Sequence, residues 1–280
     1  MLKKLEEINL SHNCFKMWPS QLESCIQLKK ISFSHNHLRR IASTIKLNRK
    51  LVYLDVSYNL LGIDDDGKLR GDIETLAALE YLDLSHNDIT DLFSDASKLE
   101  HLMYFNVKHN KLYSLPNSFG AMYRLVEVDI SHNNIDSLPA SIGNCASIKT
   151  FKAQFNRLGP SLVDSIGGLK SLQEVYLHNN LLTSLPDSIA ACRNVKRVTL
   201  NQNQLQQLPD DIGQWQDLNA LNLSSNCLRQ LPPSLFTITK VKFMDFHTNR
   251  ITEIPSTLGL ACSLAYLDFR GNLVSWFIPQ

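Results

Sequence analysis

The chain lacks the sequence features that mark several common classes of protein. No apolar run approaches the roughly 18 residues that a membrane-spanning helix needs, and the N-terminus has no signal-peptide hydrophobic region. The formal net charge is only +1, and Lys and Arg are not concentrated enough to predict nucleic-acid binding. These absences predict a cytoplasmic protein with no membrane span and no nucleic-acid partner.

Catalytic signatures are also missing. The sequence contains no HExxH, CxxC, GxSxG or protein-kinase motif. Gly62, Gly67 and Lys68 have the spacing of a phosphate-binding loop, but Leu69 follows where Ser or Thr is needed, and three intervening aspartates would repel phosphate. A calcium loop aligned on Asp66 and Gly67 lacks carboxylates at its first and last ligand places. The sequence therefore predicts no enzyme activity, no cofactor and no metal.

The six cysteines do not form a disulfide framework. Three of them occupy apolar places and are expected to be small buried side chains: Cys25, Cys145 and Cys192. Cys14 and Cys227 each follow a turn. Because the cysteines are dispersed and not clustered at the ends, the disulfide-linked caps of secreted repeat proteins are absent, which also indicates a cytoplasmic protein.

One eleven-residue pattern organises the whole chain. Residues 125–135 read LxxLxLxxNxL, with apolar residues at the first, fourth, sixth and eleventh places and Asn at the ninth. Twelve copies of this pattern begin at Leu5, Leu28, Leu51, Leu79, Leu102, Leu125, Ile148, Leu172, Val195, Leu218, Val241 and Leu264. Most copies start 23 residues apart, within the range of about 20 to 29 residues that is typical of leucine-rich repeats.

Each half of a repeat predicts its own structure. The alternation around Val128 and Ile130 predicts a short strand with one apolar face, which a neighbouring repeat must cover. The ninth-place Asn offers a donor and an acceptor to backbone groups that would otherwise be buried without partners. The second half, such as residues 138–148, reads LPxxIxxCxxI, whose apolar spacing favours a helical or 3₁₀ turn that Pro139 can start.

With these motifs the chain resembles the cytosolic leucine-rich repeats of the 23-residue LPxxIxxL type. That type occurs in Ras-binding intracellular scaffolds, in plant intracellular Ras-group repeat proteins, and in Scribble and Erbin. The resemblance implies an α/β leucine-rich repeat solenoid shaped as a curved horseshoe, with a parallel sheet on the concave face and short turns on the convex face. We expect about twelve repeats in a single domain, 1–280, with both ends apparently uncapped.

Partner-binding residues are sought at the places that the core does not use. The third, fifth, seventh and eighth places of each repeat are expected to point outward from the concave sheet. Aromatic and acidic residues recur there, as in protein-binding hot spots. The candidate residues are Tyr53, Asp55, Tyr58, Tyr81, Asp83, His86, Tyr104, Asn106, His109, Asp129, Phe155, Tyr176, Arg197, Phe243, Asp245, Tyr266 and Asp268. The alternative explanation is that tyrosines are good strand residues that stack across strands.

Histidine fills the eighth place of five repeats, at His12, His35, His86, His109 and His132. Neighbours there would lie about 4.8 Å apart, the spacing of strands in a sheet. Parallel side chains converge poorly on one ion, so this column predicts no metal site. An open sheet also encloses no small-molecule substrate.

The sequence predicts a protein–protein interaction scaffold in intracellular signalling, binding a folded partner on the concave sheet. The resemblance suggests a small Ras-like GTPase or a phosphatase subunit as that partner. The alternative is a targeting or autoinhibitory region of a larger signalling enzyme, since similar repeats occur beside phosphatase, kinase, Roco-type GTPase and adenylyl cyclase domains. The oligomeric state stays open.

Overall fold

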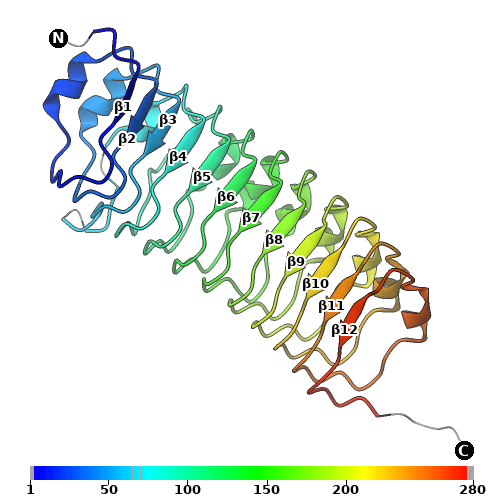
Figure 1. The fold of residues 1–280 in the computed structure, drawn as a ribbon. Coiled ribbons are helices and arrows are strands. Elements are labelled where there is room, and N and C mark those ends of the chain that lie inside the picture. Colours follow the sequence, from blue (N-terminus) through cyan, green and yellow to red (C-terminus); the bar gives the residue numbers. More distant parts are fainter. Residues whose placement is uncertain (1–2, 65, 70, 276–280) are drawn as a thin grey trace, which may run out of the picture. The chain divides into compact units, whose positions relative to one another are not determined.

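The structure repeats one small unit of strand, turn and 3₁₀ helix along the chain (Figure 1). A computed structural model describes residues 3–64, 66–69 and 71–275. The chain separates into two compact units, residues 1–135 and 136–280. Asp65 of the long insertion and the outermost residues at both ends lie outside the described residues, so the expectation of uncapped ends stays a prediction. The expectation of one continuous domain also stays a prediction.

Both units are built on parallel strands of three residues at the third to fifth places of each repeat, as the alternation predicted. In the first unit they are β1 Glu7–Asn9, β2 Lys30–Ser32, β3 Tyr53–Asp55, β4 Tyr81–Asp83, β5 Tyr104–Asn106 and β6 Glu127–Asp129. In the second unit they are β7 Thr150–Lys152, β8 Glu174–Tyr176, β9 Arg197–Thr199, β10 Ala220–Asn222, β11 Phe243–Asp245 and β12 Tyr266–Asp268. Strand order follows chain order within each unit, which confirms the leucine-rich repeat solenoid fold.

The other half of most repeats forms a short 3₁₀ helix, as predicted. The first unit contains η1 Ser20–Ser24, η2 Ser43–Leu47, η3 Ile73–Thr75 and η4 Phe119–Ala121. The second contains η5 Ala140–Asn144, η6 Asp164–Gly168, η7 Asp187–Ala191, η8 Asp210–Gln214, η9 Pro233–Thr237 and η10 Ser256–Leu260. Proline directly precedes η1, η5 and η7 to η10. At η4 the pattern differs, because Ser118 precedes the helix and Pro116 accepts a hydrogen bond from the Phe119 N–H.

The apolar places of the repeat form the core, since the strand and helix faces of adjacent repeats bury one another. Ile148, Phe151, Ala153 and Leu158 are at most 1 % exposed. The helices pack so closely that Gly143 has no room for a side chain, because a Cβ would collide with the Ser165 carbonyl of the next repeat. Cys25, Cys145 and Cys192 are buried, as expected, and burial raises the pKa of the Cys145 thiol to about 12.

The ninth-place asparagines form the predicted internal ladder. The Asn59 side-chain amide donates to the Phe33 carbonyl of the preceding repeat at 2.9 Å and to Val56 of its own repeat at 3.1 Å. The Asn59 Oδ1 accepts from the Leu38 N–H at 2.9 Å. Asn226 in the second unit makes the equivalent bonds. Each asparagine thus satisfies buried backbone groups on both sides of a repeat junction.

Candidate interaction surface of the open sheet face

The side chains of the strands' first and third residues lie on the face of the sheet opposite the core, which we call the open face. In the first unit the register pairs Tyr53 with Tyr81 and Tyr81 with Tyr104. The three rings stack with centroids 4.2 and 4.3 Å apart, and we call them the tyrosine stack. Burial, the largest cause, raises the pKa of each phenol, so the rings remain neutral at physiological pH.

Carboxylates lie beside the tyrosine stack, at the third residue of each strand, whereas the tyrosines occupy the first. Asp55, Asp83 and Asn106 lie side by side in register, and Asp129 follows Asn106. Asp83 and Asp129 are each only 8 % exposed, so they lie deeper than an outward-pointing column suggests. Burial, followed in smaller measure by the charge of Asp55, raises the pKa of Asp83. Hydrogen bonds from the Ser85 N–H and the Asn106 amide hold that carboxylate in place.

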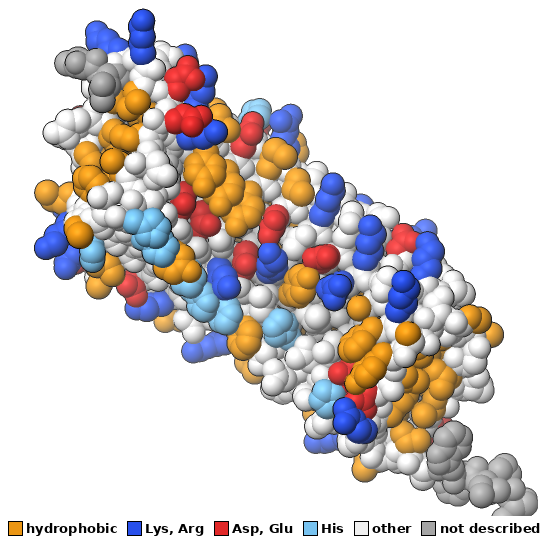
Figure 2. Space-filling model, viewed as in Figure 1, with side chains coloured by type: hydrophobic (Ala, Val, Ile, Leu, Met, Phe, Trp, Pro, Cys, Tyr) orange, Lys and Arg blue, Asp and Glu red, His pale blue; other side chains and the backbone are white. Residues whose placement is uncertain are grey.

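The eighth-place column of the first unit forms a continuous row of stacked rings, which we call the ring ladder. Its rings belong to His12, His35, Tyr58, His86, His109 and His132, with centroids 4.0 to 4.4 Å apart. Their backbones have φ between 52 and 56°, a left-handed conformation that side chains other than Asn and Asp rarely adopt. Burial, the largest cause, lowers the pKa values of His86 and His109. Figure 2 shows the histidine row beside an apolar cluster with carboxylates over the strands of the first unit.

The second unit repeats the aromatic and acidic pattern at β11 and β12. The rings of Phe243 and Tyr266 stack at 4.7 Å, and Asp245 lies opposite Asp268 in register. Here an imidazole or a guanidinium lies against each carboxylate. His247 Nδ1 lies 2.7 Å from Asp245, and Arg270 donates two hydrogen bonds of 2.6 and 2.9 Å to Asp268 Oδ2. Hydrogen bonding from Arg270 is the main reason that the pKa of Asp268 lies well below its ordinary value.

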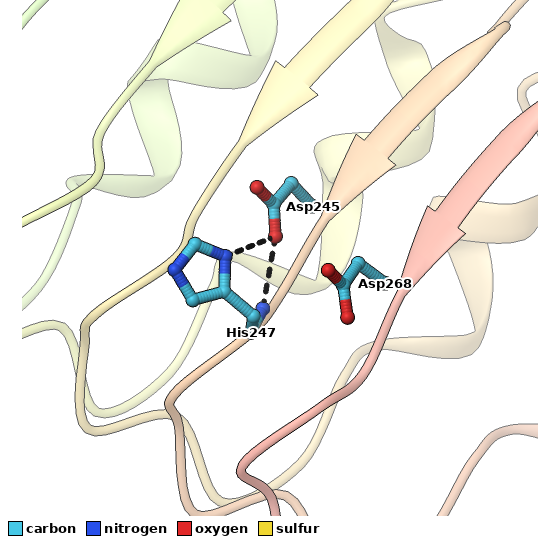
Figure 3. Close-up of side chains that lie close together, drawn as sticks. All are labelled: Asp245, His247 and Asp268. Atoms are coloured by element: carbon cyan, nitrogen blue, oxygen red, sulfur yellow. Dashed lines mark hydrogen bonds and ion pairs between the residues drawn. The ribbon is translucent and has the colours of Figure 1, made fainter.

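Asp245, His247 and Asp268 are the one group of three potential metal ligands found among the described residues (Figure 3). Their ligand atoms lie within 4.8 Å of one another. A cation there would compete with the Arg270 guanidinium for Asp268, which Arg270 already holds as an ion pair. The sequence search missed His247 and Arg270. Both residues occupy the seventh place of their repeats, two residues after each aspartate, and this position could have identified them.

The remaining candidate residues lie in the second unit, with Phe155 after β7, Tyr176 on β8 and Arg197 on β9. The Tyr176 hydroxyl donates to Glu174 at 2.9 Å, and the register places Arg197 opposite Glu174. Phe155 packs edge-on against His178, with ring centroids 5.4 Å apart. Partner binding by any of the candidate residues stays a prediction.

Comparisons with known proteins agree with this architecture. The sequence profile of the family described as Leucine rich repeat matches residues 77–135, and a related profile described as Leucine Rich Repeat matches residues 171–192. These segments are therefore leucine-rich repeats. Within the described residues no helix is long and apolar enough to cross a membrane.

Similar proteins come from several contexts. Adenylate cyclase of Schizosaccharomyces pombe is 37 % identical over 93 residues, which cover 33 % of this chain but only 5 % of that cyclase. The Leptospira interrogans LRR protein LIC12759 superposes with a TM-score of 0.68 at 25 % identity, covering 98 % of this chain and 80 % of that one. The LRR ectodomain of the Arabidopsis thaliana receptor kinase GASSHO1/SCHENGEN3, solved with CASPARIAN STRIP INTEGRITY FACTOR 2, gives 0.58 at 27 %, covering 94 % and 38 %.

Proposed function

We propose that this protein is a non-catalytic scaffold that binds a folded protein partner through the open face of its first unit. The tyrosine stack carries the proposal, because three aligned rings offer a large, rigid surface at little cost in side-chain entropy. Asp55 and Asp83 beside it supply charge for orientation. The similar ectodomain of GASSHO1/SCHENGEN3, solved in complex with CASPARIAN STRIP INTEGRITY FACTOR 2, supports a binding role for this fold.

We place the scaffold in intracellular signalling, in the cytoplasm. The six cysteines form no disulfides, and those in the core are packed as apolar side chains, which suits a reducing compartment. A small Ras-like GTPase or a phosphatase subunit is the partner suggested by the resemblance to Ras-binding repeat proteins.

The test replaces two of the three rings of the stack, the central Tyr81 and its neighbour Tyr104. The double variant Tyr81→Ala/Tyr104→Ala is expected to weaken partner binding by about 2 kcal/mol, roughly 30-fold, because the aromatic contact area is lost. Partners recovered by wild-type protein are quantified against the variant by mass spectrometry, and the strongest is then purified and titrated by calorimetry.

A matched control removes an exposed ring outside the stack. Tyr123 follows η4, away from the strands, and is 45 % exposed, so Tyr123→Ala leaves the open face intact. Equal partner affinity in wild type, Tyr123→Ala and the double variant would remove the open face as the binding site. Circular dichroism establishes that each variant retains the fold.

A second candidate function is a targeting or autoinhibitory repeat region of a larger signalling enzyme. The similarity of a third of the chain to a fragment of adenylate cyclase favours it. The mass of the endogenous polypeptide, detected with an antibody against the acidic insertion, separates the two proposals. A band near 31.8 kDa supports the free scaffold, and a much larger band supports the enzyme region.

A further inference from the structure

A hollow opens in the open face of the first unit at one end of the tyrosine stack. Its volume is about 600 Å³, and its walls include Glu7 of β1, Lys30 and Ser32 of β2, and Tyr53 and Asp55 of β3. The aromatic ring and the carboxylate at its β3 side therefore face the same space. Hydroxyl groups add acceptors, because Ser11 and Ser32 also line it and lie 2.7 Å apart.

The charges in this hollow do not balance. Lys30 is paired with Glu7 at 3.1 Å, and Asp55 has no ion pair within the part of the chain that the structure describes. The Asp55 Oδ1 accepts from the Ser57 N–H at 3.0 Å and from its hydroxyl at 2.7 Å. The Asp55 Oδ2 accepts a long hydrogen bond of 3.3 Å from the Ser32 hydroxyl. The Oδ2 atom of Asp55 can thus accept a further hydrogen bond. The charges of Glu7, Lys30 and Asp55, which line the hollow, add up to a negative value.

The fold itself does not require a charge at this place. In the second unit Asn222 occupies the same place of its repeat, and its Oδ1 accepts from the Ser224 N–H at 3.0 Å and from the Ser224 hydroxyl at 2.7 Å. A neutral amide therefore performs the same structural task as the Asp55 carboxylate. The negative charge of Asp55 is available for recognition.

Tyr53 adds an aromatic wall to the hollow. Tyr81 covers one face of its ring, while the register neighbour on the other side is Lys30, whose side chain is engaged with Glu7. A ring face beside an uncompensated carboxylate attracts a planar organic cation by both quadrupole and Coulomb interactions. An anionic group such as phosphate would be repelled by Asp55.

We propose that this hollow receives an arginine side chain of the partner protein, with its guanidinium bonded to Asp55 and lying against Tyr53. The inference rests on the proposed function and names the chemistry that the partner must present. Arginine fits better than lysine because its planar fork of five donors matches the Asp55 oxygen and the neighbouring serine hydroxyls.

The test uses two small probes on the full chain, Nα-acetyl-arginine methylamide and its neutral isostere Nα-acetyl-citrulline methylamide. Amide shifts of Tyr53, Asp55 and Ser57 are followed by ¹H–¹⁵N NMR during titration. The arginine probe is expected to shift these signals about tenfold more than the citrulline probe at equal concentration. Asp55→Asn is expected to lower the arginine response to the citrulline level, because the amide keeps the Ser57 bonds and removes the charge.

Asp245→Asn in the second unit is the matched control, since the Asp245 carboxylate is already paired with His247. It should leave the arginine response at β3 unchanged. Equal responses to the two probes, or an unchanged response in Asp55→Asn, would overturn the inference. So would a partner that binds Asp55→Asn with wild-type affinity but loses binding in Tyr81→Ala/Tyr104→Ala. That last result would overturn the arginine site but keep the proposed function. If neither variant loses partner binding, both the arginine site and the proposed function are wrong.

Discussion

Two stretches of open sheet face carry the same pattern of stacked rings and aspartates, one at β3–β5 and the other at β11–β12. In the first, Asp55 and Asp83 have no ion pair with any described residue, and burial raises the pKa of Asp83. In the second, His247 is hydrogen-bonded to Asp245, and Arg270 forms an ion pair with Asp268. The same repeat pattern thus produces one surface whose aspartates have no ion pair with a described residue and one whose aspartates have partners within the chain.

Both surfaces are built on the same asparagine ladder. The largest effects on the free energy of unfolding should therefore be equal in the two units. Asn59→Ala and Asn226→Ala are each expected to destabilise their unit by about 3 kcal/mol, because several buried backbone groups lose their partner. Urea unfolding followed by circular dichroism measures the change. The exposed Asn13 bonds only within its own turn in the described structure, so Asn13→Ala should cost much less. A cost at Asn226 far below that at Asn59 would show that the units do not share one scaffold.

An intermediate effect should appear as a pH dependence of stability to which both units contribute, since burial also lowers the pKa of His178 in the second unit. The pKa values of His86 and His109 are lowered in the folded state, so the unfolded state takes up protons first as the pH falls. The stabilisation is fully present above about pH 6.5 and declines below it. Urea midpoints between about pH 7 and 5 should fall, and less steeply in His86→Gln/His109→Gln. An identical slope in wild type and the double variant would exclude the ring ladder as the origin.

The smallest effect, on individual carboxyl groups, gives the sharpest comparison. Titration of the carboxyl ¹³C signals should place the pKa of Asp83 above its ordinary value and that of Asp268 below it. Arg270→Gln should return Asp268 towards its ordinary value without moving Asp83, since hydrogen bonding from Arg270 is the main cause of the shift. The elevated pKa of Asp83 means that its ionisation costs stability as the pH rises through that value. Shifts in the same direction for both groups would contradict the proposed difference between the surfaces.

Much of the molecule could be predicted because its repeat leaves little choice. Apolar residues at the first, fourth, sixth and eleventh places can be buried only if neighbouring repeats stack, and a short alternating strand can pair only with the equivalent strand of the next repeat. The ladder role of Asn59 and the burial of Cys145 followed from the same periodicity. The columns of tyrosine and aspartate were also visible, since they share a place in the frame.

The sequence showed which residues follow the aspartates but not how they are oriented. Asp55 and Asp245 occupy equivalent places, and only the structure shows that Ser57 and His247 turn their side chains onto them. The hollow beside Tyr53 likewise arises from side chains on three adjacent strands, and so exists only after stacking. The sequence by itself therefore determined the repeat, its core and the columns on the open face, because these follow from period and polarity. Tertiary structure alone decided the depth of the aspartates and the hollow, because these depend on contacts between residues that lie about a repeat apart. It also decided the side-chain rotamers that bring His247 and Arg270 onto their aspartates.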